Sequence, residues 1–357
     1  MSTPVAGNNF DIIRFGFASL VILSHSYPLA TGTEIDEPLM RLSGGQMTLG
    51  TLSVYGFFMI SGYLIAQSWA RKPQITSFLS KRVRRIYPGF LVASTLCAFV
   101  VAPIFSETGG GAFTPAFALD FAAHALRLIF LQPFAAFPGN PSPGPVNGSL
   151  WSIPFEFWCY VGLMVVGLLG GLKRPTWLAA ALPLLMLAAF VVAFRDLRIG
   201  GKWLGAIFGY PVFWSRLLPY FVAGMLFQSC GARIRYSAFG AWVAAASLAV
   251  ACAIPYALGF VLPLAGAYLI LWLAFLPTTH ASRFARHGDY SYGIYLYAFP
   301  IQQMLAHWSG THAPWLLFAM AWPATIVAGA LSWHLVEHRF IRSQVGQRAL
   351  PDALAPN

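Results

Sequence analysis

Long apolar stretches recur along the whole sequence, and they constrain the fold more than any other feature. A helix needs about 20 mostly apolar residues to cross a bilayer, and ten stretches come close to that length. Only 9% of the residues are charged, against roughly 25% in soluble proteins. We therefore expect an all-α polytopic membrane protein, a bundle of about ten transmembrane helices that forms one domain over residues 1–340. The expected spans are residues 10–30, 47–69, 87–106, 149–171, 176–194, 211–229, 237–254, 257–277, 290–307 and 315–336.

Lysine and arginine residues concentrate in alternate connections between these spans. With a cytoplasmic N-terminus, fifteen of the 22 lie on the cytoplasmic side and four lie outside. Because positive residues favour the cytoplasmic side, we expect both termini there, including the short polar tail 341–357. This bias explains most of the net charge of +11. The expected partner is therefore the lipid bilayer and not nucleic acid.

Residues 117–137 are apolar enough to resemble a further span. If they crossed the membrane, every later connection would change sides and the charge bias would disappear. Asp120, His124 and Arg127 also recur at helical spacing and form a polar face. We expect a re-entrant segment or one on the outer surface, packed against the bundle. The Pro- and Gly-rich loop that follows is expected to form a wall or lid over an outward-facing site.

Ionisable residues mark the first span as a functional candidate, because they are costly inside a membrane. Arg14 and His25 are eleven residues apart, so they differ by only about 20° in direction and lie roughly 16 Å apart along a helix. Asp11 shares this face. We expect the face to line the protein interior or a water-filled cavity. The alternative is an Asp11–Arg14 pair at one surface with His25 at the other.

Two further motifs have both a functional and a structural interpretation. Ser61 and Gly62 could supply a hydrogen bond and room for a ligand chain, or they could simply permit close helix packing. Arg82 and Arg85 share a helix face, and paired guanidiniums suit phosphate recognition. The alternative is that both are ordinary positive charges that contact lipid headgroups.

Glu156 lies well inside the fourth expected span, close to Trp151. A buried carboxylate needs a partner, and the candidates are His25, Arg14 and Arg216. A contact with His25 would orient the imidazole as a base. A structural pair with an arginine is the alternative.

Tyrosines cluster at the start of the ninth span, where interfacial aromatic residues are common. We assign at most a ligand-lining role to Tyr292 and Tyr295. No metal site is expected, because the cysteines have no ligand spacing and are typical of small buried residues. They are Cys97, Cys159, Cys230 and Cys252.

Several of these motifs occur together in a single order, and the combination resembles the acyltransferase 3 family of integral membrane acyltransferases. The resemblance covers about residues 8–340. Each motif alone is weak, but five of them coincide with the expected topology. They are the Arg14-x10-His25 span, FFMISGY with Ser61 and Gly62, Arg82-x-x-Arg85 before IYP, SLWSIPFEF with Trp151 and Glu156, and SYGIYLY with Tyr292 and Tyr295.

The resemblance implies transfer of an acyl group, usually acetyl, from cytoplasmic acyl-CoA to a hydroxyl of an envelope saccharide, glycolipid or related acceptor. It implies no permanently bound cofactor, and a stand-alone form without the esterase-like domain of some relatives. It also implies that Arg14 and His25 are essential and that Arg82, Arg85 and Glu156 belong to the site.

The sequence departs from the family pattern in two places. Tyr297 stands where the ninth-span motif often has histidine, and Glu337-His338-Arg339 stands where the last span usually ends Glu-x-Pro. Tyr297 is therefore not assigned to the site.

The chemistry agrees with the resemblance, since a neutral His25 could remove the proton of an attacking hydroxyl. Ser61, Trp151 or a free backbone group could stabilise the oxyanion. An acyl-His25 intermediate is a competing mechanism. A membrane transporter of a sugar or acyl species, and a non-catalytic membrane subunit, are the competing functions. The sequence does not indicate the acceptor, the acyl chain or the oligomeric state.

Overall fold

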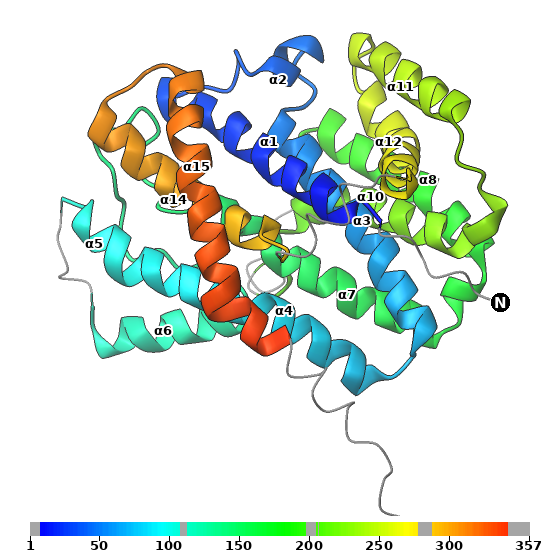
Figure 1. The fold of residues 1–357 in the computed structure, drawn as a ribbon, viewed down its shortest axis with the longest axis horizontal. Coiled ribbons are helices and arrows are strands. Elements are labelled where there is room, and N and C mark those ends of the chain that lie inside the picture. Colours follow the sequence, from blue (N-terminus) through cyan, green and yellow to red (C-terminus); the bar gives the residue numbers. More distant parts are fainter. Residues whose placement is uncertain (1–7, 108–112, 198–204, 206, 278–287, 342–357) are drawn as a thin grey trace, which may run out of the picture.

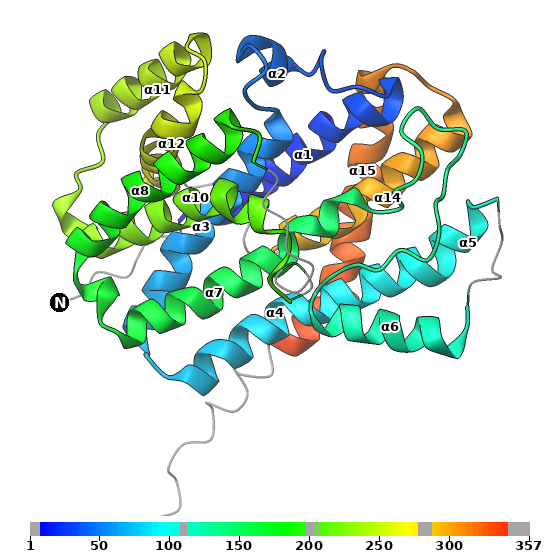
Figure 2. The same cartoon turned by 180° about the vertical axis from the view of Figure 1, so that it is seen from behind.

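The computed structural model describes residues 8–107, 113–197, 205, 207–277 and 288–341, and its regular elements in this part of the chain are all helices. The long helices form one bundle, seen from two sides in Figures 1 and 2. Its helices are α1 (Phe10–Thr31), α2 (Pro38–Leu42), α3 (Leu49–Arg71), α4 (Ile75–Leu96), η1 (Cys97–Val101), α5 (Ala102–Ile104), α6 (Pro115–Leu126), η2 (Gly148–Ser152), α7 (Ile153–Leu168), η3 (Gly171–Lys173), α8 (Pro175–Phe194), α10 (Pro211–Cys230), η4 (Gly231–Arg233), α11 (Ala238–Ala253), α12 (Ala257–Phe275), α14 (Ser291–Ser309), α15 (Pro314–Ser332) and η6 (Trp333–Glu337).

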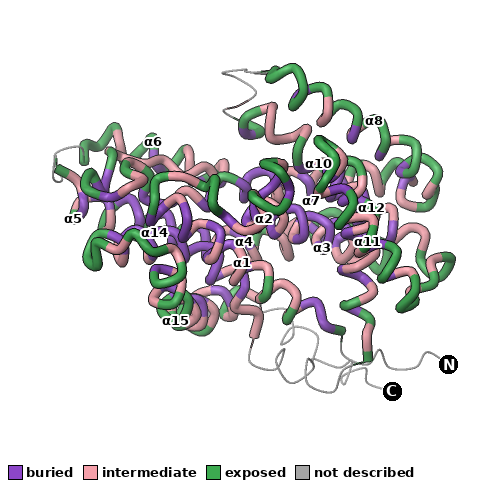
Figure 3. Tube along the Cα trace, turned by 90° about the horizontal axis from the view of Figure 1, so that it is seen from above, coloured by how far each residue is buried: buried purple, intermediate pink, exposed green. Residues whose placement is uncertain are grey.

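Each expected span overlaps one long helix, which confirms the all-helical prediction. Seven helical segments among the described residues are long and apolar enough to cross a membrane. The total of ten spans and the side of each terminus stay predictions, and the tail 342–357 lies outside the described residues. Burial follows the expected pattern, since the buried positions gather in the middle of the bundle and the outer faces of α8 and α15 are more exposed (Figure 3).

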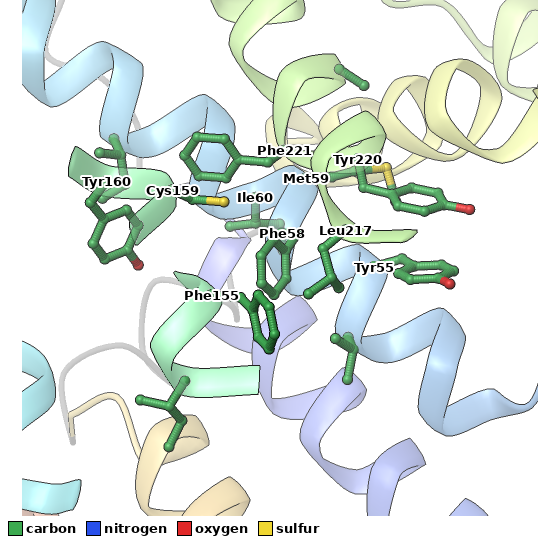
Figure 4. Close-up of a cluster of buried hydrophobic side chains, with 14 of the residues drawn as sticks. Tyr55, Phe58, Met59, Ile60, Phe155, Cys159, Tyr160, Leu217, Tyr220 and Phe221 are labelled. Carbon is green, nitrogen blue, oxygen red and sulfur yellow. The ribbon is translucent and has the colours of Figure 1, made fainter. Parts of the chain in front are cut away.

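Helices α1, α3 and α10 lie side by side at the centre. Rings of Phe10 and Tyr63 lie 5.9 Å apart, and a Cβ at Gly56 would meet the Phe17 ring at 2.4 Å. These contacts set the register of α1 against the antiparallel α3. On the other face of α3, Tyr55 stacks on Tyr220 of α10 at 3.8 Å (Figure 4).

Glycines bring α3 and α10 together. A Cβ at Gly62 would lie 2.1 Å from the backbone oxygen of Phe221, and one at Gly224 would lie 2.1 Å from that of Met59. Small residues allow helix backbones to approach closely in membranes. The structure therefore places Gly62 in a helix contact.

Replacing Gly224 with alanine is expected to force these two backbones apart. Overpacking of this kind costs about 1–3 kcal/mol, so the apparent melting temperature in detergent should fall by several degrees. Gly162→Ala on α7 is the matched control, because nothing lies within 4 Å of the added Cβ. Equal melting temperatures for the two variants would contradict this account of the contact.

The segment after α5 packs against the bundle. Helix α6 has only 12 residues, about 18 Å, which is too short to cross. Phe117 and Phe121 on α6 contact Phe99 of η1, and α6 runs beside α4 and α5 in both views (Figures 1 and 2). The segment 117–137 is thus a short helix followed by irregular chain.

The Pro- and Gly-rich loop before η2 is fixed to α14. The Asn140 amide donates to the Gln303 side-chain oxygen at 2.7 Å. Gln303 in turn donates to the carbonyl oxygens of Ser142 and Pro145 at 2.9 and 3.0 Å. A loop with this many buried bonds forms a wall on this side of the bundle.

Candidate active site

A cavity of about 630 Å³ opens between α1, α3, α4, α7 and α14. On α3 its lining runs from Val54 to Ile65, about 16 Å along the helix. The cations of α4 line the end that the charge bias assigns to the cytoplasm. The cavity brings together seven of the predicted site residues, which are Arg14, Ser61, Arg82, Arg85, Glu156, Tyr292 and Tyr295.

Two of the lining arginines are held by carboxylates. Asp289 Oδ2 lies 2.6 Å from Arg14 Nη1 and 2.5 Å from Arg85 Nη2. Arg85 Nη1 lies 3.1 Å from Glu337 Oε2, and Ser332 donates to the other Glu337 oxygen at 2.9 Å. The network thus ties α1, α4 and η6, the turn that continues α15, to Asp289, which lies two residues before α14.

Asp289 is the centre of this network. Burial would raise the pKa of its carboxyl, but Arg14 and Arg85 lower it to about 2. The carboxylate therefore stays ionised at any physiological pH. Ser291 also donates to it through its hydroxyl and, at 3.2 Å, through its backbone N–H.

Sequence reasoning missed both acids. Asp289 stands just before the ninth expected span and Glu337 just after the tenth, so neither lies inside an apolar stretch where an acid would stand out. The signal that could have found them is the number of intramembrane cations, since buried arginines need partners. Glu337 lies in the π-helical turn η6, a type of distortion that is frequent at functional sites. Among the residues described, Arg14 makes its ion pair with Asp289 and not with Asp11.

Arg82 differs from Arg85, because no carboxylate holds it in the described structure. Its Nη2 donates to the Ser68 hydroxyl at a long 3.4 Å, and its Nε is buried without a hydrogen-bond partner. The guanidinium lies over the rings of Phe78 and Tyr160, 5.6 and 5.8 Å from their centroids. Arg82 is therefore the cation of the pair that is available to an anion in the cavity.

Glu156 faces the cavity from the first turn of α7. Its Oε1 accepts hydrogen bonds from the Ser61 hydroxyl, at 3.1 Å, and from the Tyr160 hydroxyl. Figure 4 shows Tyr160 beside the aromatic core of α3, α7 and α10. Neither His25, Arg14 nor Arg216 bonds this carboxylate, so the predicted partners of Glu156 were wrong for the described structure, and Tyr160 is a site residue that the sequence did not reveal.

The two predicted tyrosines have defined partners. Tyr292 donates to the Ile86 carbonyl at 2.8 Å and its ring lies 5.3 Å from the Arg85 guanidinium. Tyr295 donates to the Ser149 carbonyl at 2.6 Å and also bonds the Ser152 hydroxyl at 2.6 Å. Both residues therefore fix the cavity wall between α14 and its neighbours.

Trp151 lies in η2 with 39% of its surface exposed. Its ring packs on Phe213 and Phe155 at 4.7 and 6.0 Å. Neither Trp151 nor Gly62 is among the residues that line the cavity.

His25 lies beyond the outer end of the cavity. A Cβ at Gly50 would meet Ser24 Oγ at 3.0 Å, so the antiparallel register places His25 level with Leu49. That level is about 8 Å outward from Val54 and about 18 Å from Ser61. The His25 ring packs on Phe299 of α14 at 5.3 Å, and its Nδ1 is buried without a partner.

Comparison with known proteins shows which family the chain resembles along almost its whole length. A family model described as an acyltransferase domain, Acyl_transf_3, matches residues 8–333. The chain is similar to an O-acetyl transferase of Shigella phage Sf6, 29% identical over 341 residues, which are 94% of this chain and 96% of that protein. It is also similar to Nodulation protein 10 of Rhizobium leguminosarum bv. viciae, 27% identical over 353 residues and 92% of each chain. No solved structure matches it significantly. The chain therefore belongs to the acyltransferase 3 family of multi-pass membrane acyltransferases.

Proposed function

We propose that this protein is an acyl-CoA-dependent O-acyltransferase of a bacterial inner membrane, which moves an acetyl group to a hydroxyl of an envelope saccharide or glycolipid. The observation that carries the proposal is the cavity, which has a cationic mouth and a mainly apolar interior with a few polar groups, among them Ser61 and Glu156. The relative named O-acetyl transferase supports acetyl as the group transferred. The cytoplasmic placement of the mouth rests on the charge bias.

In this proposal the acyl-CoA donor enters the cavity with its thioester end first, and its phosphates stay at the mouth. CoA phosphates fit the mouth, where Arg82 lacks a carboxylate partner and Lys81 and Arg84 also line the cavity. Arg85 supports the mouth from within the ion-pair network. The pantetheine arm then lies along α3 past Ser61 and Glu156, and the thioester reaches the outer end near Tyr295.

The transfer step needs a base at that outer end. His25 is the nearest candidate, because its Nδ1 is buried, unpartnered and about 8 Å further outward along the bundle. In this mechanism the acceptor oxygen forms a bond to the thioester carbon while His25 takes its proton. The C–S bond then breaks, and the CoA sulfur receives the proton from His25. Glu156, held by Ser61 and Tyr160, lies too far inward to act on His25 directly and positions the arm instead.

Arg82→Ala tests the donor site. We expect acetyl-CoA binding by purified protein to weaken about tenfold or more, since a charged hydrogen bond to phosphate contributes roughly 1.5–3 kcal/mol. Arg233→Ala is the control, because Arg233 is exposed in η4, on the side predicted to be cytoplasmic and away from the cavity. If both variants bind radiolabelled acetyl-CoA as tightly as wild type, the cavity is not the donor site.

A further inference from the structure

Three buried polar atoms on segments that adjoin Phe299 have no hydrogen-bond partner in the described structure. They are His25 Nδ1 on α1, Ser149 Oγ in η2 and Gln302 Oε1 on α14. The His25 ring packs on Phe299 at 5.3 Å. Gly148, which precedes Ser149, would place a Cβ only 2.8 Å from the same ring. The three atoms thus belong to α1, to η2 and to α14 itself, and both α1 and η2 pack against Phe299 of α14.

The third segment is tied directly to the turn of α1 that carries His25. The Gln302 amide nitrogen donates to the Ile22 carbonyl and to the Ser26 hydroxyl, both at 2.8 Å. These residues lie on either side of His25 in α1. The Gln302 side chain is therefore held beside the His25 turn, with its oxygen left over.

Leaving these atoms unpaired is costly. A buried donor or acceptor without a partner has lost its hydrogen bonds to water and gained none in return. Other polar groups in the same region are paired, including Asn147, which donates to the Leu296 carbonyl at 2.9 Å, and Ser152, which bonds Tyr295. The unpaired atoms are thus the exception here, and a bound hydroxylated ligand would explain them.

The cluster lies next to the donor cavity. Tyr295 lines that cavity and donates to the backbone oxygen of Ser149, and Phe299 is one helical turn further outward on α14. A group at the outer end of the cavity is therefore separated from the cluster by about one turn of helix, roughly 5 Å.

We propose that Ser149 and Gln302, together with His25, form the subsite for the acceptor's hydroxyl groups, an inference that rests on the proposed acyltransferase function. A basic His25 Nδ1 and Gln302 Oε1 both accept hydrogen bonds, whereas Ser149 Oγ can donate one. The matching ligand brings two neighbouring hydroxyl donors, as an uncharged sugar ring does. The reacting hydroxyl donates to His25, its neighbour donates to Gln302, and Ser149 donates to the oxyanion that forms on the thioester carbonyl.

Ser149→Ala separates this role from a structural one. The variant is expressed in a deletion strain of the protein's own host, which supplies the acceptor, and ester-linked acetate is released from the envelope by mild alkali. We expect about a hundredfold slower appearance of ester, as for loss of one oxyanion donor. Acetyl-CoA binding by the purified variant should stay within twofold. Its melting temperature should not fall, because the lost hydroxyl satisfies no partner in the protein.

Ser94→Ala is the matched control, because Ser94 is equally buried but donates to the Leu91 carbonyl of its own helix. Normal ester formation by Ser149→Ala would overturn the proposed subsite. So would a joint loss of ester, donor binding and thermal stability, which would make the hydroxyl structural. If the wild type itself forms no acetyl-CoA-dependent ester, the proposed function fails instead.

Discussion

Replacing His25 with alanine is expected to slow acyl transfer by about 10²- to 10⁴-fold, the usual contribution of a general base. The physical reason is that an acceptor hydroxyl is a weak nucleophile until a base removes its proton. Donor binding should be unchanged, because His25 does not line the cavity. The measurement is the rate of ester formation in envelope membranes at saturating acetyl-CoA, together with acetyl-CoA affinity.

His307→Ala is the matched control for this experiment. His307 also lies on the outer part of the bundle and packs its ring edge-on against an aromatic side chain, Phe105, at 5.3 Å. Its loss should leave transfer within about twofold of wild type. A His25→Ala enzyme that transfers at more than a tenth of the wild-type rate would remove His25 from the chemistry.

The second large effect is expected at Asp289. Its carboxylate is 15% exposed and holds two guanidiniums. Breaking a buried ion pair by removal of one partner costs about 3–5 kcal/mol, because the remaining charges are left uncompensated. We therefore expect Asp289→Ala to lower the melting temperature markedly and to abolish activity, since Arg14 and Arg85 line the cavity.

Asp289→Asn removes the charge but keeps the shape of the side chain. It should reproduce most of the fall in melting temperature and activity expected for Asp289→Ala. Asp120→Ala is the control, because Asp120 is an exposed acid on the surface helix α6, and it should melt like wild type. Wild-type stability of both Asp289 variants would show that the network does not hold α1, α4 and α15 together.

Much of this architecture was predictable from the sequence, because the strongest signals are local. Apolar length predicted the long helices, and the charge bias kept residues 117–137 out of the count of spans, in agreement with the short helix α6. Seven of the ten predicted site residues line the cavity, since a charged side chain in a membrane must face protein or water.

What the sequence could not supply is which polar groups meet. The Arg85–Asp289 contact joins residues 204 positions apart, and no periodicity links them. The sequence left His25, Arg14 and Arg216 as candidate partners of Glu156, whereas its hydrogen-bond donors are Ser61 and a tyrosine one turn along its own helix. Gly62 could have served a ligand or a helix contact, and only the close approach of α10 decides between them.

The most direct test of the central claim uses purified protein in vesicles with envelope acceptor from a deletion strain. Acetyl-CoA is supplied with one label on the acetyl carbon and another on the CoA moiety, on the side of the Arg82 mouth. The account predicts that the acetyl label appears as alkali-labile ester on the acceptor while free CoA stays on the side of supply, and that Arg82→Ala and His25→Ala both prevent this. Passage of a labelled sugar across the vesicle without acetyl-CoA, and without any ester, would instead indicate a transporter and contradict the account.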